Sequence, residues 1–185
     1  MMSVKEQKKA LRAEMKKRAE NFTSDYRKRA SEDICRQVTE NSEFQQAEKV
    51  FLFAGAFGEP DTSEIISYAL EGGKTVALPL CFKGGVMEAR IINSMNELEP
   101  GMFGIMEPPK DSRVMEPSDI DFVLMPCVAA SPAGERLGHG MGYYDRFLED
   151  SAAYKLMVCP DLFLQEGIPV EEFDLRADCV ITNRK

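Results

Sequence analysis

The chain has 185 residues, a formal net charge of −8 and five cysteines. This length suits one domain that buries about 70% of its unfolded surface, and an odd number of cysteines without a C-x-x-C pair favours buried, reduced thiols in a cytosolic protein. The acidic balance argues against a general nucleic-acid binder, and no apolar run is long enough to cross a bilayer. We therefore expect a single domain over residues 1–185 in a cytoplasmic protein that binds neither nucleic acid nor membrane.

The first forty residues predict two helices, over 4–20 and 24–40, because apolar side chains recur in each with helical spacing. The first apolar stripe is Leu11, Met15 and Ala19, and the second is Ile34 and Val38. The sequence thus predicts an N-terminal helical pair.

The first of these helices is basic. Residues 1–30 carry ten lysines and arginines against four acidic residues, whereas the rest of the chain is strongly acidic. Four cations fall at i, i+3, i+7 and i+11 and so line one helix face, namely Lys5, Lys8, Arg12 and Lys16. Charged helix surfaces are common, so a solvated face is the ordinary interpretation of this stripe taken alone.

A strand, helix, strand unit comes next. The apolar run 50–54 predicts a buried strand, a helix is expected over 64–70 with Gly72 and Gly73 at its end, and 75–80 predicts a second strand parallel to the first. Further apolar runs predict strands at 86–92, 122–125, 155–159 and 179–181. Runs without polar alternation suit strands buried on both faces. We expect an α/β single-domain layered fold with a mainly parallel central sheet flanked by helices, and ligands near the carboxyl ends of the strands.

Two carboxylates follow directly on the first predicted strand, where functional residues of α/β folds gather. Asp61 has a structural explanation, because either Asp61 or Thr62 can cap the next helix. Glu59 has no such role, and it could hold the N–H edge of a heterocycle or move a proton. The segment 93–119, rich in Pro, Gly, Met and Glu, is predicted to be a long surface segment that either lines a site or is a plain loop.

The run from Arg136 to Arg146 contains three alternating glycines, Gly138, Gly140 and Gly142. Its spacing excludes both the G-x-G-x-x-G dinucleotide motif and a Walker A loop. A flexible loop and a phosphate cradle explain the glycines equally well. The flanking charges favour a nucleotide site, because cations complement phosphate and the carboxylate of Asp145 can hold Mg²⁺. A helix starting at Tyr143 would direct its positive end to the same place.

These residues resemble the 5-formyltetrahydrofolate cyclo-ligase family, also called methenyltetrahydrofolate synthetases. The resemblance rests on the block R-L-G-x-G-x-G-Y-Y-D-R at 136–146, which is highly specific, and on supporting matches spread from residue 8 to residue 182. These matches are Lys8-x-x-Leu11-Arg12, Glu59-Pro60-Asp61-Thr62, Gly104-Ile105-x-Glu107-Pro108 and Asp174 before Val180-Ile181-Thr182. Cys127, Ala130, Ser131 and Phe173 depart from the residues usual in the family.

The resemblance implies an ATP- and Mg²⁺-dependent ligase that cyclises 5-formyltetrahydrofolate, with or without a polyglutamate tail, to 5,10-methenyltetrahydrofolate and releases ADP and phosphate. It implies a phosphorylated formyl group, an iminium phosphate, as the intermediate. We expect a monomer or a weak homodimer.

The resemblance also assigns residues to each ligand. ATP binding falls on Lys8, Lys9, Ala10, Leu11 and Arg12 and on Arg136, Leu137, Gly138, His139, Gly140, Met141, Gly142, Tyr143 and Tyr144. Folate contacts fall on Ala54, Glu59, His139, Gly140, Met141, Gly142 and Tyr143. The magnesium ligands are Asp145 and Asp174, and the residues expected to act in catalysis are Glu59, Arg136 and Tyr144.

Two other classes of function stay open at this point. A folate- or nucleotide-binding protein without turnover would not need the metal pair, so retention of Asp145 and Asp174 speaks against it. An isomerase or transferase that acts on a phosphorylated metabolite could use a similar α/β scaffold, because a fold does not determine a function.

Overall fold

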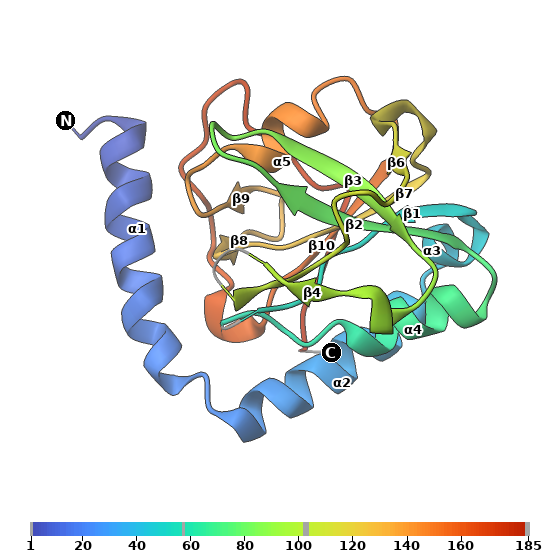
Figure 1. Ribbon diagram of the computed structural model, residues 1–185. Coiled ribbons are helices and arrows are strands. Elements are labelled where there is room, and N and C mark those ends of the chain that lie inside the picture. Colours follow the sequence, from blue (N-terminus) through green and yellow to red (C-terminus); the bar gives the residue numbers. More distant parts are fainter. Residues whose placement is uncertain (1, 57, 102–103, 184–185) are drawn as a thin grey trace.

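A seven-stranded sheet forms the centre of the computed structural model, which describes residues 2–56, 58–101 and 104–183 (Figure 1). Its strand order is β11-β10-β7-β1-β2-β3-β6. The strands are β1 (Lys49–Phe51), β2 (Thr75–Cys81), β3 (Met87–Ile92), β6 (Val114–Met115), β7 (Phe122–Met125), β10 (Tyr154–Val158) and β11 (Cys179–Ile181). The β11-β10-β7-β1-β2 pairs are parallel, and β3 and β6 add antiparallel to that edge. The predicted mainly parallel sheet is therefore confirmed.

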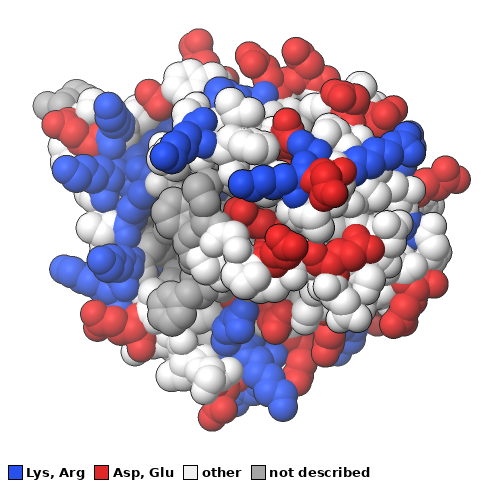
Figure 2. Space-filling model, viewed as in Figure 1, with Lys and Arg blue, Asp and Glu red and all other residues white. Residues whose placement is uncertain are grey.

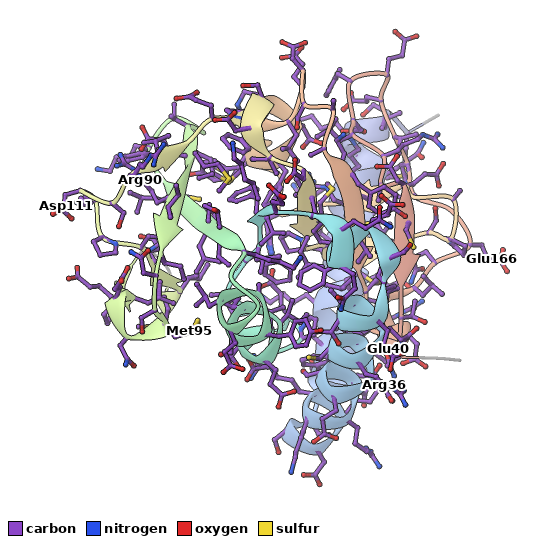
Figure 3. All side chains as sticks on the ribbon, turned by 90° about the vertical axis from the view of Figure 1, so that its right-hand side faces the viewer. Arg36, Glu40, Arg90, Met95, Asp111 and Glu166 are labelled. Atoms are coloured by element: carbon purple, nitrogen blue, oxygen red, sulfur yellow. The ribbon has the colours of Figure 1, made fainter. Side chains whose placement is uncertain are left out.

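Helices cover both faces of this sheet. They are α1 (Val4–Arg18), α2 (Ser24–Glu40), α3 (Ser42–Gln46), α4 (Ser63–Glu71) and α5 (Tyr143–Phe147), with short 3₁₀ turns η1 (Ala19–Asn21), η2 (Met95–Glu97), η4 (Pro117–Asp119) and η5 (Asp161–Phe163). Figure 3 shows α2, with its labelled Arg36 and Glu40, beside α4. Among the described residues, none of the helices combines the length and apolarity that crossing a lipid bilayer requires.

Two apolar clusters hold the layers together. Side chains alternate along β7, so that Phe122 and Leu124 pack with α2, α3 and α4, while Val123 and Met125 pack with α5 and with Met15 of α1. Because successive side chains of a strand point to opposite faces, an entirely apolar strand must be covered twice. The predicted apolar stripes of the N-terminal helices are confirmed, since Met15, Ile34 and Val38 are fully buried.

Three sequence predictions need correction. The first strand ends at Phe51 rather than at residue 54, and the described residues 52–56 and 58–62 belong to no helix or strand. The segment 93–119 is not only a loop, because β4 (Glu99–Pro100) pairs with β5 (Met106–Glu107) and β6 pairs with β3. The basic face of α1 is divided: Lys8 and Arg12 turn to the body, whereas Lys5 and Lys16 are exposed.

Thr62 fixes the loop that carries Glu59. Its hydroxyl is fully buried, donates to the carbonyl of Phe53 and accepts from the backbone N–H of Gly55 at 3.0 Å. We expect Thr62→Val to keep the shape but leave both backbone groups unpaired, lowering the free energy of unfolding by about 1–3 kcal/mol. Urea unfolding measures the change, with Thr75→Val at an exposed strand position as control. Equal stability of the two variants would contradict this role.

Candidate active site

The candidate site lies where four strands end at the same edge of the sheet. Strands β1, β2, β7 and β10 run parallel, so the segments that follow them leave the sheet on one side. These segments bring together the loop with Glu59, the turn 82–86, Cys127 and Cys159. This is the edge at which α/β folds bind ligands.

The glycine-rich segment forms a loop over this edge. It leaves β9 (Arg136–Leu137), which pairs with β8 (Ala129–Ala130), and enters α5 at Tyr143, as predicted. Gly140 and Gly142 have φ angles of 96° and 66°, a region that favours glycine. A Cβ atom on Gly138 would lie 3.1 Å from the Arg136 guanidinium, and one on Gly140 would lie 3.3 Å from that of Arg12. The backbone of the loop thus lies against two cations.

Arg136 is the more buried of these two cations, with 9% of its surface exposed. It donates to Asp145 at 3.0 Å and to the carbonyl of Pro126 at 3.4 Å, and its guanidinium lies over the Tyr144 ring. Within the described part of the chain, its Nε atom and the Tyr144 hydroxyl are buried without a hydrogen-bond partner. Buried donors without acceptors are rare in folded proteins, so both groups fit a site that receives acceptor oxygens.

The N-terminal helix contributes a second cationic group. Lys8, also 9% exposed, donates to Asp174 at 2.5 Å and to Glu171 at 3.2 Å. One turn along the same face, Arg12 donates to the carbonyl of Gly138 at 2.8 Å. Figure 2 shows that lysine and arginine side chains gather over α1, on the left of that view. Helix α1 therefore carries cations to the glycine loop and to the segment 171–175.

Glu59 lies at the inner side of the site. Its Oε2 atom accepts the backbone N–H of Ala56 at 3.0 Å, and its Oε1 atom lies 3.7 Å from Nε2 of His139, too far for a hydrogen bond. Its backbone carbonyl accepts from Arg27 at 2.9 Å. Asp61 instead accepts the N–H of Ser63 at the start of α4, as the capping interpretation predicted. The Asp61 carboxylate therefore binds the start of α4, whereas the Glu59 carboxylate binds the backbone within its own loop.

Two groups near Glu59, Tyr144 and Cys127, have raised pKa values. Burial raises the pKa of Tyr144, and the nearby charge of Glu59 raises it further. A hydrogen bond with Cys159, together with burial, raises the pKa of Cys127 well above its usual value. A phenol that stays protonated can donate a hydrogen bond but cannot act as a base near neutral pH. All five cysteines are free thiols; Cys35, Cys127 and Cys159 are buried as predicted, whereas Cys81 and Cys179 are only partly buried.

Asp145 and Asp174 are joined through the backbone rather than directly. Asp145 accepts from the N–H of Leu175 at 3.2 Å, and Asp174 accepts from that of Glu171 at 2.6 Å. No cluster of three or more metal-ligating side chains occurs in residues 2–56, 58–101 and 104–183. Mg²⁺ commonly binds through one or two carboxylates and takes its remaining ligands from water and phosphate. The donor set fits Mg²⁺ that arrives with a phosphate.

The structure does not bring every predicted residue to the same place. Lys9 and Ala10 are exposed on α1, and Leu11 packs against the core beside Arg12. Ala54 lies half-buried in the loop before Glu59. In the glycine-rich segment, Leu137 is buried, whereas His139 and Met141 are exposed. Contacts that the sequence did not indicate come from Arg146, which bonds to the turn 82–86.

The chain is similar in sequence and in fold to known proteins of one family. Residues 4–183 match the model of the 5-formyltetrahydrofolate cyclo-ligase family. The 5-formyltetrahydrofolate cyclo-ligase of Escherichia coli K12 is 35% identical over 145 residues, which cover 75% of this chain and 80% of that protein. The solved structure of Aquifex aeolicus 5,10-methenyltetrahydrofolate synthetase superimposes with a TM-score of 0.84 at 31% identity, covering 96% of this chain and 90% of that one. A Mycoplasma pneumoniae synthetase, 18% identical with a TM-score of 0.74 over 94% of this chain and 97% of that one, shares the fold.

Proposed function

The chain belongs to the 5-formyltetrahydrofolate cyclo-ligase family, and from this premise we propose that it converts 5-formyltetrahydrofolate to 5,10-methenyltetrahydrofolate with ATP and Mg²⁺. The observation that carries the proposal is the convergence of Arg12, Arg136 and the glycine loop at the strand ends. Cations and backbone groups placed around one loop are what phosphoryl transfer requires of a protein, because positioning and charge neutralisation supply most of the catalysis. We propose that residues 1–185 act as one domain.

The reaction activates a poor leaving group. Bound ATP and Mg²⁺ would supply the phosphoryl group that makes the formyl oxygen a leaving group. Attack of N10 on the formyl carbon, with loss of the N10 proton, could then expel that oxygen as phosphate and close the methenyl bridge. Arg136 neutralises charge on the transferred group, and the buried hydroxyl of Tyr144 donates a hydrogen bond to an oxygen in the site. Asp145 and Asp174 hold the metal ion, and Lys8 and Arg12 hold the phosphates.

Glu59 is assigned to the folate. Its carboxylate lies at the inner side of the site, so it can accept the N–H edge of the pteridine and move a proton as the ring closes. His139, Gly140, Met141, Gly142 and Tyr143 provide the surface over which the folate lies, and Ala54 lies at the start of the opposite loop.

The decisive experiment follows the near-ultraviolet absorbance of the methenyl product. Purified protein is mixed with 5-formyltetrahydrofolate, with ATP and Mg²⁺ together, with either alone and with neither. We expect product only when both are present, and loss of product on chelation of the metal. Product without ATP would overturn the proposed dependence, and binding of both ligands without product would favour a protein that binds folate but does not turn it over.

A further inference from the structure

The turn between β2 and β3 is the part of the site edge that the proposed function leaves without a role. It spans residues 82–86 and is closed by a hydrogen bond of 2.8 Å from the N–H of Phe82 to the carbonyl of Val86. Gly84 and Gly85 both have positive φ angles, of 82° and 80°. Gly84 is exposed, whereas Gly85 is buried although it belongs to a surface turn. Something outside the turn must cover Gly85.

Arg146 covers it. Its Nη2 and Nε atoms donate to the carbonyl of Gly85 at 2.8 and 3.2 Å, and Nη2 also donates to the carbonyl of Met141 at 2.5 Å. The second bond reaches the glycine loop, so one guanidinium joins the turn 82–86 to that loop. The Tyr143 hydroxyl also donates a hydrogen bond to this turn, at 3.0 Å to the carbonyl of Phe82. Figure 1 shows α5, which carries both side chains, beside β3.

The fit around this guanidinium is tight. A Cβ atom on Gly85 would lie 1.9 Å from Nη2 of Arg146, and one on Gly142 would lie 2.7 Å from its Nη1. Glycine at these two positions therefore leaves room for the arginine as well as permitting the backbone angle. By contrast, a Cβ atom on Gly84 would meet nothing within 4 Å.

We propose that Arg146 is a positioning residue that fastens the glycine loop, residues 138–142, to the turn 82–86 and thereby sets the conformation in which the loop binds its ligands. A loop with three glycines has high conformational entropy, which binding must otherwise remove. Arg12 holds the loop at Gly138, and Arg146 holds it at Met141, so both ends are fixed before a ligand arrives. The inference rests on the proposed function only in taking this loop as the ligand-binding segment.

Gly84 and Gly85 provide a matched pair of variants. Gly84→Ala and Gly85→Ala impose the same backbone strain, because their φ angles differ by only a few degrees. Only Gly85→Ala also displaces Arg146. We expect Gly85→Ala to lower kcat/KM for 5-formyltetrahydrofolate about 10- to 100-fold, chiefly through KM, and Gly84→Ala to change it less than about threefold. Amide hydrogen exchange of residues 138–142 should rise about tenfold in Gly85→Ala alone.

The same pair is then compared in an Arg146→Ala background. The fastening is already absent there, so the added effect of Gly85→Ala should shrink to that of Gly84→Ala. Arg146→Lys should recover part of the exchange protection, since an ammonium can donate to a carbonyl but has no counterpart of the Nε atom that also bonds to Gly85. Thermal unfolding of each variant shows that it is folded.

Three results would overturn the inference. These are equal effects of the two glycine variants in the wild-type background, a full Gly85→Ala defect that persists without Arg146, and loop exchange that is unchanged in Arg146→Ala. A wild-type protein that binds neither ATP nor folate would instead overturn the proposed function, and the exchange measurement would still decide whether the turn holds the loop.

Discussion

Arg136→Ala is expected to lower kcat by roughly 10²–10³-fold, with a smaller effect on KM for the folate. The guanidinium is buried and lies between Asp145, the Pro126 carbonyl and the Tyr144 ring. Charge that develops on the transferred phosphoryl group would then lose a cation that these contacts hold in place. Steady-state kinetics at saturating ATP measure the effect, and a kcat within about threefold of wild type would remove Arg136 from catalysis.

A matched variant separates charge from geometry at this position. Arg136→Lys keeps the positive charge but cannot bond to Asp145 and Pro126 in the same way. We expect it to restore part of the stability lost in Arg136→Ala, where the Asp145 carboxylate is left in a mostly buried place without its cation, and to restore little of the turnover. Thermal unfolding measures the stability of each variant, and steady-state kinetics measure its turnover. Full recovery of kcat in Arg136→Lys would show that charge alone matters.

Glu59→Gln should lower turnover by about 10²–10⁴-fold while the affinity for ATP stays within twofold of wild type. The amide is close to isosteric and can keep its oxygen on the Ala56 N–H, so the loop should hold its shape. What is lost is the charge and the ability to take a proton. Single-turnover absorbance measures the chemical step, and calorimetric titration with a nonhydrolysable ATP analogue measures the affinity.

Asp61→Asn is the control for Glu59→Gln. Asp61 lies in the same loop but is exposed, and its side chain caps α4. Asparagine is an equally good cap, so this variant should keep both stability and turnover. If Glu59→Gln retained wild-type turnover and ATP affinity, Glu59 would have no part in the reaction.

The sequence predicted the elements well where its periodicity was long. The helices expected at 4–20 and 24–40 are α1 with η1, and α2. The first strand was predicted too long, because Leu52 and Phe53 are as buried as the strand residues before them. Apolar side chains identify burial, and they do not show where a strand stops pairing.

The sequence predicted candidate residues for the site but not the hydrogen bonds between them. The glycine run and its flanking charges marked the loop that we propose to bind the ligands, and the resemblance implied roles for Lys8 and Arg12. No sequence signal marked the acceptors of Arg146, because they are backbone carbonyls and every residue has one. In the same way, the division of the basic stripe on α1 depended on where the helix lies against the body, which only tertiary packing determines.

The cations of the site already have oxygen partners within the chain, and this has a thermodynamic consequence. Lys8 is bonded to Asp174, Arg136 to Asp145, and Arg12 to a backbone carbonyl. Where a triphosphate takes over the donor groups that Lys8 gives to Asp174 and Arg136 gives to Asp145, those two carboxylates lose their partners. Leaving these carboxylates without a cation costs free energy, and a divalent ion that binds them removes this cost. The triphosphate and the divalent ion should therefore strengthen the binding of each other by the same factor, as linkage requires.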